Sequence, residues 1–322
     1  MQRRSWWSVG RRFAAGIDVN RRTVRIAVLS RRARGGAVRL EALDAEPLPA
    51  GAFDEPADAF DEPADADWVA VAAAMAAALG RVPPMRPAGW VRRTMAGVMA
   101  LPAGAFSSAT LAWPRADAAA AVEPAVRAAA ERLTGLARDA LAVDWCVNDA
   151  GAASELVFAT AAHVHLDVRI EAAASAGVEL VAIDGEPPAA LRAIRHVAAR
   201  EVDSGEPYLG VWIGESGVHG WLVSADAVAA QIRYPAPEHA DLADALRELA
   251  RAGAPRCAFV AGDPEWLGGA RISLADVGDL LGCIVLPFEC AACGPLGAVD
   301  DGLAHSPGFA VAFGLALRGV FE

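Results

Sequence analysis

Two segments at opposite ends of the chain constrain the fold most. Residues 13–29 have the pattern of a strand, a short turn and a second strand, with Asp18 as a buried acid where the first strand ends. Residues 307–319 have the pattern of an apolar helix that ends at Gly319, a residue typical of a helix C-cap. The sequence predicts an α/β protein in which this closing helix completes the lobe that the opening hairpin begins.

Length and composition favour a globular protein without a membrane-spanning segment. The chain has 322 residues, enough for two or three lobes, and its hydrophobic fraction of 55% is inflated by alanine. No run of bulky apolar residues is long enough to span a bilayer. The early arginines are followed by an apolar run that Asp18 interrupts, so we expect no secretory signal. Five irregularly spaced cysteines do not suggest a disulfide framework and fit a reducing compartment.

Charge is distributed unevenly along the chain. Residues 1–40 hold eleven arginines and one acid, a net charge of +10, so the total of −11 leaves −21 for residues 41–322. One interpretation is a bias of genome composition with solvated strand faces. The other is attraction to an anionic membrane surface by a basic N-terminal segment, residues 1–12, where Trp6 and Trp7 accompany the arginines. We expect no nucleic-acid binding, because no basic patch with interleaved aromatic residues recurs.

The order of elements along the chain predicts two hairpin-led halves with an insertion. The opening hairpin continues as a meander to residue 44, and residues 52–65 are a direct tandem repeat that we interpret as an exposed loop. From 94 to 183 the order is strand, helix, strand, strand, helix, strand, which is that of a ferredoxin-like module. A second hairpin is expected at 207–224. The elements expected within the module are strands at 94–102, 108–113, 141–148, 155–162 and 178–183 and helices at 117–133 and 165–176.

An opening hairpin with an acid near its tip, together with a Gly-rich apolar closing helix, resembles the actin-like ATPase superfamily. The closing Gly-Leu-Ala-Leu-Arg-Gly of residues 314–319 is similar to the end of the PilM-type type IV pilus assembly proteins. The segment Met99-Ala-Leu-Pro102 and the stretch 174–184, which precedes a Pro-containing helix, are similar to the same family. The resemblance covers about residues 13–320 and rests on pattern more than on identity.

The resemblance implies an α/β, bilobed actin-like (ribonuclease H-like) fold with an inserted ferredoxin-like module, placed as in the cell-division protein FtsA. The first lobe would comprise residues 13–93, completed by 184–206 and 306–322. The module would comprise residues 94–183, and the second lobe residues 207–305.

Actin-like proteins hold a nucleotide between two hairpin turns and a third glycine-containing loop. Small residues in these turns let backbone N–H groups approach phosphates, and acids orient a metal-bound water. The candidate cofactor-binding residues implied by the resemblance are Gly16, Asp18, Asn20, Arg21, Arg22, Gly214, Glu215, Ser216, Gly217 and Gly262.

Several of these positions depart from the family pattern. Arg21 and Arg22 replace small residues of the first turn, Trp212 stands where relatives keep an acid, and Asp263 follows the glycine of the third loop. Glu215 is expected to point elsewhere than position 212, because strand side chains alternate. Two alternatives stay open: ATP with Mg²⁺ bound through Asp18, or a relict cleft with no tightly bound cofactor. We identify no catalytic residue, and turnover is expected to be negligible.

Cysteine and histidine residues do not suggest another chemistry. Cys290 and Cys293, with Cys283 and His305 as the nearest helpers, have the spacing of no common zinc site and are interpreted as buried small residues. No histidine has a matched nucleophile nearby.

The resemblance implies a cytoplasmic scaffold, peripheral on the inner membrane. Its partner would be the N-terminal peptide of a bitopic inner-membrane protein of the PilN type, held in a groove beside the module and so linked to the pilus motor. The alternatives are an actin-like ATP-binding protein with weak ATPase activity, and a component similar to the cytoplasmic domain of the type II secretion protein GspL.

Overall fold

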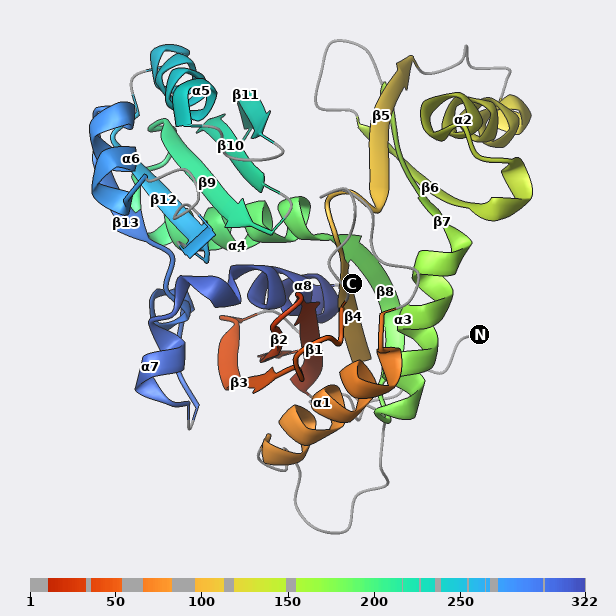
Figure 1. Ribbon diagram of the computed structural model, residues 1–322. Helices are drawn as coiled ribbons and strands as arrows, with labels where there is room; N and C mark the ends of the chain where they lie inside the picture. Colours follow the sequence, from red (N-terminus) through yellow and green to blue (C-terminus); the bar gives the residue numbers. More distant parts are fainter. Residues whose placement is uncertain are drawn as a thin grey trace, which may run out of the picture.

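Within the described residues, the strands form two five-stranded sheets and one three-stranded sheet with helices packed around them (Figure 1). The computed structural model describes residues 11–32, 36–53, 66–82, 96–112, 119–148, 155–215, 217–225, 227–234, 239–253, 255–263, 265–266, 272–297 and 299–321. The segment 1–10 and residues 54–65 of the tandem repeat lie outside these ranges. Among the described helices, none is both long enough and apolar enough to cross a bilayer.

The first sheet has the order β3-β2-β1-β4-β8. Its strands are β1 (Arg11–Val19), β2 (Thr23–Arg32), β3 (Arg39–Pro47), β4 (Ala96–Leu101) and β8 (Glu179–Gly185). The first three strands form the expected antiparallel meander, and β4 and β8 add in parallel beside β1. One face carries an apolar core beneath α1 (Trp68–Arg81) and α3 (His163–Ser175).

The second sheet has the order β11-β10-β9-β12-β13. Its strands are β9 (Tyr208–Gly214), β10 (Gly217–Ser224), β11 (Ala227–Tyr234), β12 (Cys257–Gly262) and β13 (Ile284–Pro287). Strands β9 and β10 are the predicted second hairpin, whereas β11 was not predicted. The helices α5 (His239–Arg251) and α6 (Leu274–Leu281) cover one face of this sheet. They form an apolar core with its strands.

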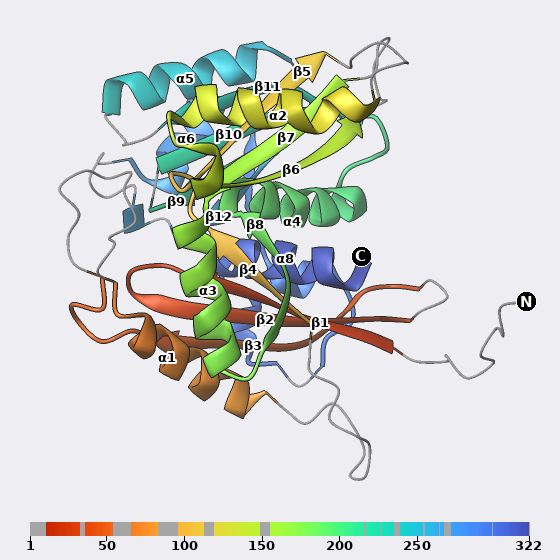
Figure 2. The ribbon, with the colours of Figure 1, turned by 90° about the vertical axis from the view of Figure 1, so that its right-hand side faces the viewer.

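Two helices, α4 (Glu186–Glu201) and α8 (Ala310–Phe321), lie between the two large sheets (Figure 2). They share the largest apolar core with strands of both sheets. Close approach requires glycine at two points: a Cβ on Gly16 would overlap the Ala312 carbonyl of α8, and one on Gly314 would overlap the Ala189 carbonyl of α4. The helix α8 continues to Phe321, so the predicted C-cap at Gly319 is wrong. Gly319 is instead a packing residue, because a Cβ there would press on Ala14.

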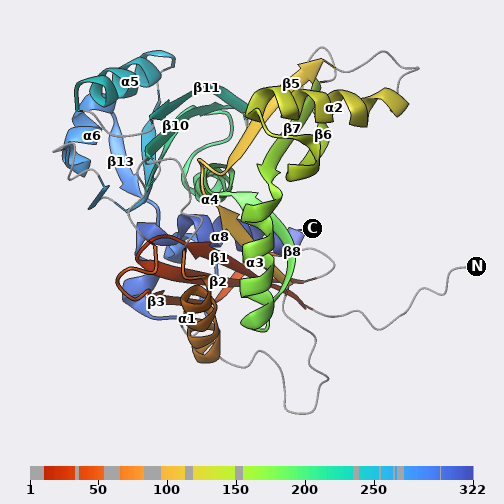
Figure 3. The same ribbon diagram turned by 45° about the vertical axis from the view of Figure 1, so that its right-hand side comes forward.

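A separate three-stranded antiparallel sheet with one helix stands beside the second lobe (Figure 3). It has the order β5-β7-β6 and consists of β5 (Phe106–Ala112), β6 (Leu141–Asn148), β7 (Glu155–Ala162) and α2 (Ala119–Thr134), with a short turn of helix, η1 (Arg138–Ala140). The helix α2 covers one face through a small core that includes Val126 and Phe158. We call these elements, residues 106–162, the module.

The predicted boundaries of the module, 94–183, are too wide. The single strand expected at the start of the module is two strands, β4 and β5, which belong to different sheets; the remaining helices and strands follow in the predicted order. β4 pairs with β1 and with β8 in the first sheet, and α3 lies against α1. Order along the chain does not fix which sheet a strand joins, and two apolar parallel strands are stabilised by completing the larger sheet.

The boundary at residue 305 also changes. The stretch after β13 contains η3 (Cys290–Cys293), α7 (Asp301–Ala304) and η4 (Pro307–Phe309). Leu296 forms a bridge with Leu40 of β3, where the Leu40 N–H donates to the Pro295 carbonyl at 3.1 Å. The residues near 295 therefore return to the first sheet before α8 begins.

Candidate functional site

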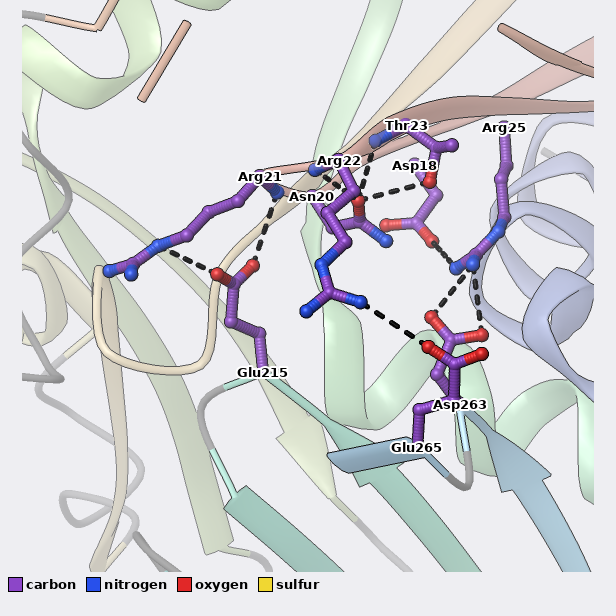
Figure 4. Close-up of polar contacts among 9 residues, drawn as sticks. All are labelled: Asp18, Asn20, Arg21, Arg22, Thr23, Arg25, Glu215, Asp263 and Glu265. Atoms are coloured by element: carbon purple, nitrogen blue, oxygen red, sulfur yellow. Dashed lines mark hydrogen bonds and ion pairs between the residues drawn. The ribbon is translucent and has the colours of Figure 1, made fainter. Parts of the chain in front are cut away.

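Three loops meet between the two lobes, as the sequence predicted: the β1–β2 turn, the β9–β10 turn and the end of β12 (Figure 4). Gly262 ends β12 with a φ of 93°, which favours glycine, and a Cβ there would overlap the backbone of Ile213. The next residue, Asp263, donates its N–H to the Ile213 carbonyl at 3.1 Å. The third loop is thus fixed against the end of β9.

The N–H groups of the first turn are already used within the protein. The Asn20 side-chain oxygen accepts from the N–H of Arg22 at 2.9 Å and from the N–H of Thr23 at 2.8 Å. The N–H of Arg21 donates to the Glu215 carboxylate at 3.2 Å. Three consecutive backbone donors therefore bind the protein's own oxygens, and a carboxylate lies where a turn of this kind offers donors to an anion.

Glu215 contacts the first turn, whereas Trp212 points into the apolar core. Strand β9 ends at Gly214, so the alternation of strand side chains does not extend to residue 215. Its carboxylate forms an ion pair with Arg21 Nε at 2.6 Å in addition to its backbone contact. These contacts join the two lobes.

Arg25 forms the second link between the lobes. It lies opposite Asp18 in the β1–β2 register, and its Nη1 is 3.9 Å from the Asp18 carboxylate. Its Nη2 donates to both Asp263 carboxylate oxygens, at 2.9 and 2.7 Å. A guanidinium therefore stands between one acid of the first lobe and one of the second (Figure 4). A Mg²⁺ ion bound through Asp18 would have to compete with this cation.

A third link is weaker because it is exposed. Arg22 Nη1 is 3.3 Å from the Glu265 carboxylate, and its guanidinium lies 5.1 Å from the Trp266 ring centroid. Both charged side chains are more than two thirds exposed, so this pair contributes little to stability.

The acids of the site share a poorly solvated region. Burial raises the pKa of Asp18 to about 7; the Arg25 cation opposes this rise, whereas Asp263 and Glu215 add to it. Burial also raises the pKa of Glu186, helped by the Asp18 charge and opposed by a hydrogen bond from the Ala103 N–H. The pKa of Glu215 is raised by burial against the hydrogen bonds and charge of Arg21. These carboxylates are not all ionised together near neutral pH.

Trp212 is buried beneath the second turn. It is 3% exposed, its ring lies 5.5 Å from that of His219, and a Cβ on Gly214 would overlap the indole. Gly214 is thus required for packing, and position 212, where the resemblance implied an acid, supplies an apolar ring to the core. Gly217, with a φ of 120°, opens β10, and Ser216 lies outside the described residues.

Sequence reasoning missed three residues of the site: Arg25, Glu186 and Asp263 as a partner of Arg25. Arg25 follows from the hairpin register once the turn is placed at residues 20–23, because Asp18 and Arg25 are then directly opposite. Glu186 precedes Pro187 and Pro188 at the start of α4. An acid in the first turn of a helix is the one sequence feature that could have identified it.

The site does not fit a Mg-nucleotide as it is arranged. The first-turn donors are bonded internally, Arg25 lies between Asp18 and Asp263, and Trp212 supplies no carboxylate. Among the described residues no three metal-ligating side chains come together. Cys290 and Cys293 are buried, and burial raises the pKa of both thiols, which agrees with their interpretation as core residues.

Comparison with known proteins shows the fold. No family model matches this sequence, and no curated protein matches it. A chain of the solved "PilM-PilN type IV pilus biogenesis complex" aligns with a TM-score of 0.70 and 20% identity over 95% of this chain and 98% of that chain.

Two further structures are more distant. The cytoplasmic domain of EpsL, an inner-membrane component of the Vibrio cholerae type II secretion system, aligns with a TM-score of 0.40 and 12% identity over 78% of this chain and 82% of that one. A Bacteroides thetaiotaomicron protein with an actin-like ATPase fold aligns with a TM-score of 0.46 and 6% identity over 94% and 95% of the two chains. The chain therefore shares its fold, over 95% of its length, with a chain of the PilM-PilN structure.

Proposed function

We propose that this protein is a PilM-type scaffold of a type IV pilus machine that binds the N-terminal cytoplasmic peptide of a PilN-type bitopic inner-membrane protein. The observation that supports this most is the extent of the structural likeness, which covers 95% of this chain and 98% of the other. Both lobes and the module are included in a likeness of that extent. The protein would act at the cytoplasmic face of the inner membrane and connect its partner to the pilus motor.

The module supplies the proposed peptide-binding element. Its sheet has β5 and β6 as outer strands, and within the described residues neither has a partner on its outer side. An extended peptide can add to such an edge through main-chain hydrogen bonds, with side-chain pockets giving specificity. The charge of −21 beyond residue 40 favours a peptide that carries basic residues.

The site between the lobes supports a scaffold better than an ATPase. Its arginines and acids satisfy one another across the lobes, so the closed arrangement needs no nucleotide to hold it. Asp18, Glu186 and Gly262 are the features that would serve the alternative, an actin-like ATP-binding protein, and a test with Mg-ATP appears in the Discussion.

The test is a calorimetric titration of the partner's N-terminal peptide into the full chain. The matched variant lacks residues 106–161, which a short Gly-Ser linker replaces. Because Phe106 and Ala161 are directly opposite in the β5–β7 pair, the linker has to span only about 5 Å. This deletion leaves β4, α3 and β8 in the first lobe, whereas a deletion of 94–183 would remove two strands of its sheet.

We expect saturable binding to the full chain, none to the deletion variant, and none of a scrambled peptide of the same composition. A cooperative thermal transition of the deletion variant shows that the lobes still fold. Failure of the full chain to bind with a Kd below about 1 mM would contradict the proposal.

A further inference from the structure

The start of β1 and the end of β2 bring four arginines together. In the antiparallel register Arg11 lies opposite Arg32, and Arg12 lies opposite Arg31. Directly opposite residues project from the same face of a sheet, and like charges in such pairs are destabilising. Two successive rows of like charge are unfavourable for the isolated fold, and an anionic ligand would relieve the repulsion.

The neighbouring side chains balance only part of this charge. Arg11 pairs with Glu41 at 2.8 Å, and Arg39 approaches the same carboxylate at 3.4 Å. Arg12 and Arg32 are exposed and have no ion-pair partner among the described residues. The five arginines around this single acid therefore leave a local charge of about +4 on the described surface. We call the residues Arg11, Arg12, Arg31, Arg32 and Arg39 the basic edge.

An exposed aromatic side chain accompanies the basic edge. The Arg31 guanidinium lies 4.2 Å from the ring centroid of Phe321, the last described residue of α8, which is 51% exposed. The Nε of Arg31 is buried without an acceptor among the described residues. A surface with cations and an adjacent exposed aromatic ring suits the lipid headgroup region, where the charges meet phosphates and the ring meets the acyl boundary.

The basic edge is at the opposite end of the hairpin from the site between the lobes. The nine residues of β1 place Arg11 about 26 Å from Val19 beside the turn. In Figure 2 this end of β1 and β2 lies on the same side of the molecule as the C-terminal end of α8. A surface bound here would leave the cleft and the module accessible to other partners.

We propose that the basic edge binds an anionic phospholipid surface directly, which deepens the peripheral localisation of the proposed function. The remainder of the chain carries −21 beyond residue 40, so an anionic surface favours approach by this end of the molecule. An arginine that reaches the headgroups strengthens binding about fivefold.

The test is co-sedimentation of the full chain with vesicles of phosphatidylcholine, with and without phosphatidylglycerol. The variant is Arg12→Ser with Arg32→Ser, since neither residue has an ion pair with any residue that the structure describes. The matched control is Arg247→Ser with Arg251→Ser on α5, which changes the net charge equally. We expect binding only to the anionic vesicles, a decrease of about 25-fold for R12S/R32S and little change for the control. The binding should weaken as salt is raised.

Folding of the variant is checked by its thermal transition, which should be no lower than that of the wild type because like-charge rows have been relieved. Equal vesicle binding by R12S/R32S, or equal binding of the wild type to neutral vesicles, overturns the proposal. Displacement from the vesicles by duplex DNA at equal phosphate concentration also overturns it and indicates a nucleic-acid surface.

The PilN-type peptide, titrated without vesicles, should bind R12S/R32S normally. If the wild type binds anionic vesicles but not the peptide, the scaffold is contradicted and the basic edge is not. If the wild type binds the peptide but not anionic vesicles, the basic edge is contradicted and the scaffold is not.

Discussion

At the scale of single residues, the buried acids of the site make the stability of the fold depend on pH. The pKa of Asp18 is raised from 3.8 to about 7, so between these values the folded state holds a proton that the unfolded state has released. Stability therefore falls as pH rises through this window, and the loss from Asp18 alone is on the order of a few kcal/mol. Glu186 and Glu215 act in the same direction.

We expect Asp18→Asn to remove part of this dependence. The variant should match the wild type at pH 5 and unfold at a higher denaturant concentration at pH 8, because the amide has no charge to bury. Urea unfolding at both pH values measures the difference, with Asp139→Asn, an exposed carboxylate on η1, as the control for loss of charge. A variant less stable than the wild type at pH 8 would mean that the Arg25 ion pair outweighs the burial of Asp18.

The sequence predicted most residues of the site but not their chemistry. Gly16, Asp18, Gly214 and Gly262 lie where the family pattern implied, because hairpins and left-handed turns leave local signals. The sequence did not predict that Arg21 and Arg25 bond acids of the other lobe. Each of these contacts joins residues that are roughly 200 positions apart in the chain. Local pattern carries no information on such pairs.

At the scale of elements, α8 depends on glycines that permit close packing. Gly314 faces the Ala189 carbonyl of α4, so we expect Gly314→Ala to destabilise the protein by several kcal/mol through overpacking against backbone. Gly80 is also helical, in α1, and a Cβ there meets nothing within 4 Å. Gly80→Ala should stabilise by up to about 1 kcal/mol through helix propensity alone. Thermal or urea unfolding of Gly314→Ala and Gly80→Ala separates the cost of packing from the gain in helix propensity. Equal changes in the free energy of unfolding would refute the role of Gly314 in close packing.

One carboxylate ties three elements of the first lobe together. Asp184, on β8, pairs with Arg192 of α4 at 2.8 Å and with Arg318 of α8 at 3.3 Å, and its side chain is 12% exposed. We expect Asp184→Asn to cost about 1–2 kcal/mol, since two partly buried guanidinium groups lose their shared partner. Asp244→Asn, which breaks an exposed pair with Arg247, should change stability by less than about 0.5 kcal/mol. Urea unfolding of both variants measures the difference. Similar losses in the free energy of unfolding would show that the Asp184 ion pairs do not stabilise the first lobe.

The type of each element was easier to predict than its partners. Periodicity and turn residues identified the hairpins and most of the helices, because both signals are local. Sheet membership was not local: β4 and β8 joined the first sheet although they flank the module in sequence. Strand β11 was missed although Ala230, Ile232 and Tyr234 alternate along its second half and pack on the core of the second lobe; the first three residues of this edge strand are exposed and give no such signal.

At the scale of the whole molecule, the arginine excess of the first 40 residues separates into two groups. Arg21, Arg22 and Arg25 bond acids of the second lobe, whereas the basic edge lies at the other end of the same strands. One hairpin thus carries positive charge to two distant places. The first group closes the lobes on each other, and the second leaves charge uncompensated on the surface.

The closed arrangement of the lobes should therefore persist without nucleotide. We expect the amides of residues 21–23 to exchange slowly with deuterium in the free protein, because each is bonded to Glu215 or Asn20. The variant Glu215→Gln with Asp263→Asn should raise their exchange rates, since it weakens both of the partly buried links between the lobes. Glu265→Gln should not, because the Arg22–Glu265 pair is exposed.

Adding Mg-ATP to the wild type distinguishes a self-closed scaffold from an actin-like nucleotide binder. The turn donors already have acceptors, so the nucleotide has to displace a carboxylate from residue 21 and a cation from beside Asp18 before it can bind. We expect no change in exchange at residues 21–23 and no shift in Tm at millimolar Mg-ATP, a shift that mass action would produce for any ligand that binds the folded state tightly. Protection by Mg-ATP that Asp18→Ala abolishes would establish a functional nucleotide site and refute the self-closed cleft.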